Sequence, residues 1–277
     1  MTQQASAEQR DGFLFKCSRC RRKKSLRKGS MLEGSRLTLA KILKIVYRYV
    51  EGVRVKRYAA LVGVHRNTAM HWYEICHNVS TSALMSAVGQ LGGKDIEVQA
   101  DETMVARQKN NKGRERRQYW VVGMYDTSIR KAVFEHVNNR SGPALNTVIT
   151  QWFAKESVVV TDEWKAYSRL PEEGYKHFTV NHSKNFVNPE TGMHTNAIEA
   201  YWSRLKRKMS ETGPTSGRAV WAHLDEAQYR LWYGLKCENL SQAWDTFVGH
   251  VANTYPLKTR DNAQVMKTAK KKYQNRN

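Results

Sequence analysis

The chain has 277 residues, and its 46 lysines and arginines against 25 aspartates and glutamates give a formal net charge of +21. An apolar fraction of 40% is enough to build a core and excludes a disordered tail. The positive charge favours a polyanionic partner such as nucleic acid, although ribosomal proteins, histones and membrane-surface proteins share it. Four cysteines are too few for a disulfide scaffold, and neither a membrane-spanning run nor a signal peptide is evident, so we expect an intracellular protein with no membrane partner.

The first predicted elements are three helices in the basic N-terminal part. Apolar residues recur every three or four positions over Leu37–Val50, which is typical of an amphipathic helix. A short helix over Val55–Leu61 and a turn at Gly63 and Val64 precede a third helix over His65–His77. This is the spacing of a helix-turn-helix unit, whose last helix enters the major groove of DNA. The predicted DNA contacts, here and in the basic run before it, are His65, Arg66, Asn67, His71, Arg21, Arg22, Lys23 and Lys24. The alternatives are three ordinary core helices and a solvated basic loop.

The central part of the chain changes to the pattern of β-strands. Runs rich in Val, Tyr and Trp at Ile96–Asp101, Gln118–Asp126 and Lys131–Val137 predict three antiparallel strands. A helix over Pro143–Phe153 is followed by the apolar run Ser157–Thr161, which suits a strand covered on both faces. The remaining predicted elements are a strand over Lys176–Val180 and helices over Thr195–Met209, Gly217–Leu235 and Leu240–Val251.

Three acidic residues stand at the ends of these predicted elements. Asp101 ends the first strand, Asp162 directly follows the apolar strand, and Glu199 lies in the first turns of the next predicted helix. Open sheets bind ligands outside their strand ends, so the three carboxylates could meet at one edge. Ordinary caps and turns are the alternative, and spacing alone does not decide between them. The neighbours Glu102 and Glu163 should point the opposite way on an extended chain, which favours Asp101 and Asp162.

The chemistry that these carboxylates suit is phosphodiester transfer assisted by metal ions. Three oxygen ligands favour Mg²⁺ or Mn²⁺ over zinc. Two such ions about 4 Å apart activate the attacking water or 3′-hydroxyl and stabilise the leaving oxygen. Glu199 lies at the flank of its helix, on a face shared with Asn196 and Lys206, and Lys206 is a candidate phosphate contact. The predicted buried stripe of that helix is Ile198, Trp202, Leu205 and Met209.

Several sequence strings resemble the Merlin superfamily of cut-and-paste transposases and their bacterial insertion-sequence relatives with an ISXO2-like DDE domain. The strings are Val159–Tyr167 (VVTDEWKAY), Val180–Ser183 (VNHS) and Gly192–Trp202 (GMHTNAIEAYW), preceded by Ala100–Thr103 (ADET), the basic stretch Arg107–Arg117 and Trp120–Gly123 (WVVG). The resemblance runs from about Phe15 to Leu235.

The resemblance implies a ribonuclease H-like catalytic core whose DDE triad maps onto Asp101, Asp162 and Glu199. It implies two Mg²⁺ or Mn²⁺ ions in each active site, double-stranded DNA with terminal inverted repeats as substrate, and a homo-oligomer of at least two chains that brings two ends together. The 36 residues between Asp162 and Glu199 agree with the usual separation in DDE transposases. Accessory candidates are His182, His194, Asn196 and Lys206, and the basic stretch adds the DNA contacts Lys109, Lys112 and Arg114. Both histidines have an alternative as hydrogen-bonded loop residues.

Cys17 and Cys20 resemble the second knuckle of an N-terminal zinc ribbon, but residues 1–16 contain no partner pair of cysteines. Tetrahedral structural zinc needs four ligands, and this pair supplies two. Cys76 and His77 are conceivable completions, but both lie on the third predicted helix. We therefore expect no structural zinc within this chain.

The expected fold class is α/β, with a ribonuclease H-like core of mixed sheet flanked by helices and a small all-α helix-turn-helix domain at the N-terminus. The expected domains are a basic segment with a remnant half zinc ribbon at residues 1–36, the helix-turn-helix domain at 37–82, the catalytic domain with C-terminal helices at 95–252 and a basic flexible tail at 253–277.

The expected function is a DDE transposase that cuts and joins DNA strands at the inverted repeats of a transposon. One alternative is a domesticated, catalytically silent DNA-binding protein, and another is a nuclease or Holliday-junction resolvase on the same core. The expected location is the nucleus in a eukaryote, or the nucleoid within the cytoplasm of a bacterium.

Overall fold

A computed structural model describes residues 1–87, 89–106, 119–181, 187, 189, 192–212 and 219–256. The chain divides into two compact units. The first unit comprises Met1–Ser86, Glu211–Gly213 and Trp221–Asn277, and the second comprises Ala87–Ser210 and Pro214–Val220. Among the described residues, no helix combines the length and hydrophobicity that crossing a membrane requires.

The N-terminal residues form a small antiparallel sheet, which corrects the prediction of an all-α N-terminal domain. Strands β1 (Thr2–Ala5), β2 (Phe13–Lys16) and β3 (Lys23–Lys24) pair in the order β1-β2-β3. The turn between β2 and β3 contains Cys17, which accepts a backbone hydrogen bond from Arg21. These strands have two to four residues, which is too short for a recognisable alternation of apolar and polar side chains. They are defined by their backbone pairing and could not be predicted from the sequence.

Three helices follow at the predicted places in the first unit. They are α1 (Leu39–Glu51), α2 (Val55–Val62) and α3 (Arg66–Ala87). Thr38 caps α1 by accepting from the backbone of Lys41. Gly52 and Gly63 end α1 and α2 in the left-handed conformation. These caps produce the tight turns that the helix-turn-helix prediction required.

Helix α3 continues ten residues past its predicted end at His77. Asn78, Ser80 and Thr81 are poor helix formers, yet all three are buried. Ser80 bonds to the Tyr49 hydroxyl at 2.9 Å, and Thr81 donates to Asp225 at 2.8 Å. The polar residues therefore face other helices, and tertiary contacts override the weak propensity.

Two C-terminal helices complete the first unit. They are α6 (Ala219–Trp232) and α7 (Leu240–Thr254), preceded by a short 3₁₀ turn, η3 (Cys237–Asn239). The Phe247 ring of α7 lies 5.3 Å from the Tyr49 ring of α1, between centroids. From Trp221 onward, these helices share a core with the N-terminal helices.

The second unit is built on a mixed five-stranded sheet in the order β6-β5-β4-β7-β8. The strands are β4 (Glu97–Ala106), β5 (Tyr119–Asp126), β6 (Lys131–Val137), β7 (Val158–Asp162) and β8 (Lys176–Val180). Strands β4, β5 and β6 pair antiparallel, whereas β4, β7 and β8 pair parallel. All five strands coincide with predicted runs, which confirms the α/β class of this part.

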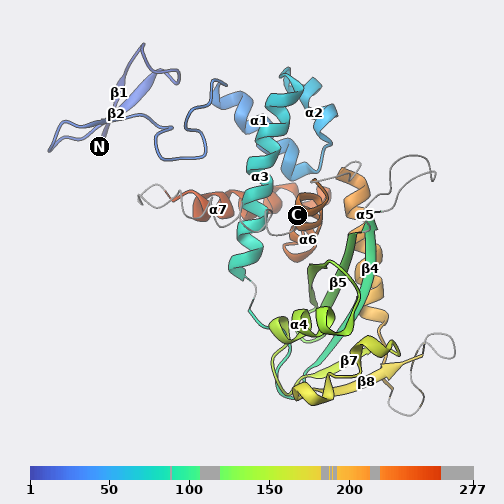
Figure 1. Ribbon diagram of the computed structural model, residues 1–277. Helices are drawn as coiled ribbons and strands as arrows, with labels where there is room; N and C mark the ends of the chain where they lie inside the picture. The colour runs from blue at the N-terminus through green and yellow to red at the C-terminus, as the bar shows by residue number, and fades with distance from the viewer. Residues whose placement is uncertain are drawn as a thin grey trace. The chain divides into compact units, whose positions relative to one another are not determined.

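Helices α4 (Gly142–Trp152) and α5 (Asn196–Thr212) lie in the same unit as the sheet, and α5 runs alongside β4 (Figure 1). Ser141 caps α4, which has Pro143 in its first turn as predicted. The link from β7 to β8 contains two 3₁₀ turns, η1 (Lys165–Tyr167) and η2 (Pro171–Glu173). Ile198, Trp202, Leu205 and Met209 of α5 are buried, as their spacing predicts.

Candidate active site

The register of the parallel strands places Asp101 and Asp162 at matching positions. Glu97 pairs with Val158 and Gln99 with Val160, and the same offset matches Asp101 with Asp162. Matching residues of neighbouring parallel strands point to the same face, about 4.8 Å apart. The prediction that Asp101 ends its strand is wrong, because β4 continues to Ala106 by pairing with β5. Asp101 instead lies just past the last residue of β4 that pairs with β7.

Helix α5 is held on β4 by a ladder of polar contacts with matching periods. Alternate residues of β4 share one face and advance by about 6.6 Å, while every fourth residue of α5 advances by about 6 Å. The hydrogen bonds run from Ile198 N to Gln99 Oε1 (3.1 Å), from Trp202 Nε1 to Asp101 Oδ2 (3.0 Å) and from Lys206 Nζ to Thr103 Oγ1 (2.6 Å). Gln99, Trp202 and Thr103 thus position the site, and sequence reasoning gave none of them a polar role.

The close approach of α5 to the sheet depends on Gly123 of β5. Gly123 pairs with Asp101, and a Cβ atom there would lie 2.5 Å from Cζ2 of Trp202 and 3.0 Å from Cδ1 of Ile198. A larger residue would therefore displace the indole that donates to Asp101.

We expect Gly123→Ala to destabilise the protein by about 1–3 kcal/mol through overpacking, and to reduce activity because Trp202 shifts away from Asp101. Urea unfolding and a DNA-cleavage assay measure the two effects. Gly249→Ala is the matched control, because nothing lies within 4 Å of its added Cβ and the position is helical. Equal stability of the Gly123 and Gly249 variants would show that α5 tolerates a wider spacing.

The second and third carboxylates are each held by local contacts. Asp162 Oδ1 accepts from the backbone of Trp164 at 3.1 Å. Glu199 lies in the first turn of α5, with its Oε1 atom 3.3 Å from the hydroxyl of the buried Thr195. The neighbouring Glu163 is exposed and accepts from Asn181 instead.

Asp101 lies near enough to Asp162 and Glu199 for their charges to affect its pKa. Burial raises the pKa of Asp101 to about 6, and the negative charges of Asp162 and Glu199 act in the same direction. The Glu102 backbone N–H and the Trp202 indole lower that pKa by hydrogen bonding to the charged form. In the part of the chain that the structure describes, the carboxylate oxygens of Asp101, Asp162 and Glu199 do not all lie within 4.8 Å of one another.

Glu102 lies on the opposite side of β4 from α5. Burial raises its pKa to about 7 and Asp162 adds to the increase, while the Tyr167 hydroxyl and Arg140 lower it. Its Oε1 atom is buried without a hydrogen-bond partner in the described part of the chain, and Oε2 lies 3.7 Å from Arg140. Only Asp101 of this neighbouring pair is held by α5.

The other predicted site residues are distributed over both units. In the second unit, Asn196 is exposed, Lys206 bonds to Thr103, and His194 has its Nδ1 atom buried without a hydrogen-bond partner among the described residues. In the first unit, His65, Arg66, Asn67 and His71 are exposed, whereas Ala69 and Trp72 of α3 are buried. Arg21, Arg22 and Lys23 are exposed and Lys24 is half-buried. His182, Lys109, Lys112 and Arg114 lie outside the described residues.

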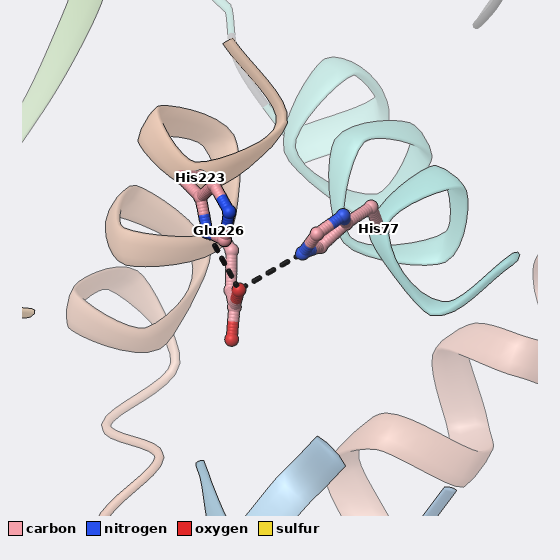
Figure 2. Close-up of side chains that lie close together, drawn as sticks. All are labelled: His77, His223 and Glu226. Carbon is pink, nitrogen blue, oxygen red and sulfur yellow. Dashed lines mark hydrogen bonds and ion pairs between the residues drawn. The ribbon is translucent and has the colours of Figure 1, made fainter. Parts of the chain in front are cut away.

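A second titratable cluster lies in the first unit, between α3 and α6 (Figure 2). His77 Nε2 is 2.9 Å and His223 Nδ1 is 3.8 Å from Oε2 of Glu226, and the three ligand atoms lie within 4.8 Å of one another. Arg230 donates to the other oxygen of Glu226 at 2.9 Å. A divalent cation here would add buried positive charge beside Arg230, so we assign the cluster as an ion-pair network. His77 is engaged in this network rather than positioned as a zinc ligand for Cys17 and Cys20.

A sequence profile of the ISXO2-like transposase domain matches residues 90–231, just over half of the chain. The chain belongs to this transposase family. The match covers the five strands and α5, so the predicted resemblance is confirmed, and the ribonuclease H-like core that it implies agrees with the observed order of strands.

Relatives of this ISXO2-like transposase chain include an uncharacterised transposase-like protein of Haemophilus influenzae. It is 27% identical over 95 residues, which cover 34% of this chain and 76% of the relative. Similar solved structures include the HTLV-2 integrase catalytic core in complex with magnesium (TM-score 0.34, 14% identity, covering 57% of this chain and 97% of the integrase). Another is the Mos1 transposase paired-end complex with the left transposon end (TM-score 0.33, 10% identity, 80% of each chain).

Proposed function

We propose that this ISXO2-like transposase cuts and joins DNA strands at the ends of a transposon by metal-dependent phosphodiester hydrolysis and transesterification. The observation that carries the proposal is the register that matches Asp101 with Asp162, with Glu199 supplied by the helix that packs on the same strand.

The donor set fits a divalent cation. Three carboxylates, one of them with a pKa raised by burial and by the charges of the other two, have a repulsion that a cation would relieve. Asp101, Asp162 and Glu199 would hold Mg²⁺ or Mn²⁺, two ions in each site, which supply an activated nucleophile and stabilise the leaving oxygen. The Trp202 indole orients Asp101, and Thr195 lies against Glu199. Rigid orientation of the ligands favours catalysis because little reorganisation is needed.

DNA is the proposed partner, in two roles as transposon end and as target. The exposed face of α3 with Arg66, Asn67 and His71, and the basic turn at Arg21 and Arg22, are the proposed contacts in the first unit. Cutting two ends together requires at least two copies of the chain. The proposed location is wherever the host keeps its DNA, in a nucleus or a bacterial nucleoid.

We expect purified protein to nick DNA carrying the flanking inverted repeat when Mg²⁺ is present. Asp162→Ala should lower the rate by about 10³-fold or more, because a metal ligand supplies several kcal/mol of transition-state stabilisation. Binding of the same DNA, measured by gel shift, should change by no more than about twofold. Glu163→Ala is the matched control, because this adjacent carboxylate is exposed and is expected to leave cleavage unchanged. Normal cutting by the Asp162 variant would refute the mechanism.

A domesticated, catalytically silent DNA-binding protein is the second candidate. The observation that favours it is that, within the described residues, the ligand atoms of Asp101, Asp162 and Glu199 do not all lie within 4.8 Å of one another. The same assay separates the candidates, because a silent protein would bind DNA without Mg²⁺-dependent nicking. Intact inverted repeats on both sides of the gene would favour the transposase.

A further inference from the structure

Arg140 of the second unit has its guanidinium between two tryptophan rings. Its Cζ atom lies 3.4 Å from the ring centroid of Trp164 and 4.3 Å from that of Trp120. Both contacts are within cation–π range, and together they fix the plane of the guanidinium. The side chain remains 34% exposed, so this fixed cation still reaches the surface.

The elements that hold Arg140 also carry the carboxylates of the candidate active site. Trp164 donates its backbone N–H to Asp162, and Glu102 follows Asp101 directly on β4. Arg140 itself precedes the cap of α4, where a Cβ on Gly142 would lie 3.2 Å from the carbonyl oxygen of Ala166. This close packing of α4 on η1 keeps the loop with Arg140 against Trp164. The cation is therefore held by residues that adjoin two of the proposed metal ligands, Asp101 and Asp162.

The hydrogen-bonding capacity of Arg140 is largely unused by its contacts. A guanidinium has five N–H donors, and the two rings engage its faces rather than its edges. The nearest carboxylate oxygen, of Glu102, is 3.7 Å away, which is longer than a hydrogen bond. In the described part of the chain, the Arg140 Nε atom is buried without a hydrogen-bond partner. The guanidinium therefore has both faces engaged and, among the described residues, its donors unpaired, and its side chain is partly exposed, which suits it to bind an anion.

We propose that Arg140 binds a DNA phosphate next to the scissile bond, with Trp120 and Trp164 holding the guanidinium in place. This inference rests on the proposed function. Phosphate is the ligand because DNA is the substrate and a fixed guanidinium donates two parallel hydrogen bonds to its oxygens. The ring clamp removes side-chain freedom before the DNA arrives, so little entropy is lost on binding. Arg140 is a positioning residue that aligns the strand over the carboxylates.

The test is a scan with methylphosphonates, which remove the charge of one phosphate at a time. Duplexes with the flanking inverted repeat carry one substitution at each phosphate around the cleavage point, and binding is measured with Ca²⁺ in place of Mg²⁺. We expect Arg140→Ala to weaken binding and slow cleavage by about 10- to 100-fold, and Arg140→Lys to recover part of this. At one phosphate position, the methylphosphonate should weaken DNA binding by the native protein about tenfold. The same methylphosphonate should leave DNA binding by the Arg140→Ala variant unchanged. Arg130→Ala is the matched control, because Arg130 is an exposed arginine at the opposite end of the β5–β6 hairpin.

Neutralising the buried Glu102 is the competing role for Arg140. In that case, adding Glu102→Gln to the Arg140→Ala variant would restore binding and cleavage. Each methylphosphonate would then weaken DNA binding by the native protein and by Arg140→Ala to the same extent. Either result would overturn the proposal. Asp162→Ala separates the proposal from the proposed function, because it should abolish cleavage and still show the coupling between Arg140 and one phosphate. If the native protein showed this coupling between Arg140 and one phosphate but never cut DNA, the proposed function would be refuted and the role of Arg140 in binding would stand.

Discussion

Glu226→Gln is expected to destabilise the first unit by about 3–5 kcal/mol, because it leaves the buried Arg230 without a counter-charge. Arg230 is fully enclosed, donates to Glu226 and also donates to the backbone carbonyls of Val50 and Tyr49. His77 Nε2 donates to the second oxygen of Glu226 at 2.9 Å, because the ionised carboxylate can only accept. The Glu226 carboxylate thus joins α6 to α3 through His77, and its partner Arg230 joins α6 to α1. Urea unfolding followed by circular dichroism measures the loss.

The surface ion pair between Arg48 and Glu51 provides the control for this prediction. Its side chains are 36% and 29% exposed, so Glu51→Gln should cost no more than about 1 kcal/mol. Similar losses for Glu226→Gln and Glu51→Gln would show that the buried network adds little to stability.

The same network predicts how stability depends on pH. Burial raises the pKa of Glu226, but Arg230, His223 and His77 outweigh it and hold the pKa well below its usual 4.5. A carboxyl group with a lowered folded-state pKa stabilises the protein above its unfolded-state pKa, and this stability is lost as the pH falls below about 4.5. Glu226→Gln should therefore remove part of the acid sensitivity of unfolding. The free energy of unfolding should be measured from about pH 3 to about pH 5, the range in which carboxyl groups usually titrate. The same pH dependence in the native protein and in Glu226→Gln would contradict this assignment.

The second large effect is expected for Asp101→Asn, which should lower the cleavage rate by about 10³-fold or more. The same change should stabilise the metal-free protein by about 1–2 kcal/mol near neutral pH, because the ionised Asp101 is buried and faces two other carboxylates. The amide keeps a hydrogen-bond acceptor for the Trp202 indole. The protein therefore gains stability as it loses its metal ligand, as is common at active sites.

Thermal unfolding with EDTA and with Mg²⁺ measures this second prediction. Mg²⁺ should raise the midpoint of the native protein more than that of Asp101→Asn, because a ligand that binds only the folded state stabilises it. Glu163→Gln is the control, since its exposed carboxylate lies next to Asp162 and should leave both midpoints unchanged. A metal-free Asp101→Asn protein that is less stable than the native one would show that the three carboxylates do not repel one another.

The five strands of the second unit, the helices around them and the family could be predicted from the sequence. These features are local, because β-branched and aromatic runs mark strands, spacings of three and four mark helices, and strings such as Val159–Tyr167 are read directly. The buried stripe of α5 followed from its period alone. The choice of Asp101 over Glu102 rested on strand alternation, and in the structure only Asp101 faces α5.

The pairing of distant segments could not be predicted from the sequence. The match of Asp101 with Asp162 is a register between strands about 60 residues apart, and no local pattern encodes a register. The glycine that admits Trp202, the extension of α3 and the clamp on Arg140 depend likewise on non-local neighbours. Burying a polar or charged side chain costs free energy unless a partner meets it, and that partner often comes from a distant segment of the chain. For this reason the strands and carboxylates could be predicted from the sequence, whereas the contacts that turn them into a site could not.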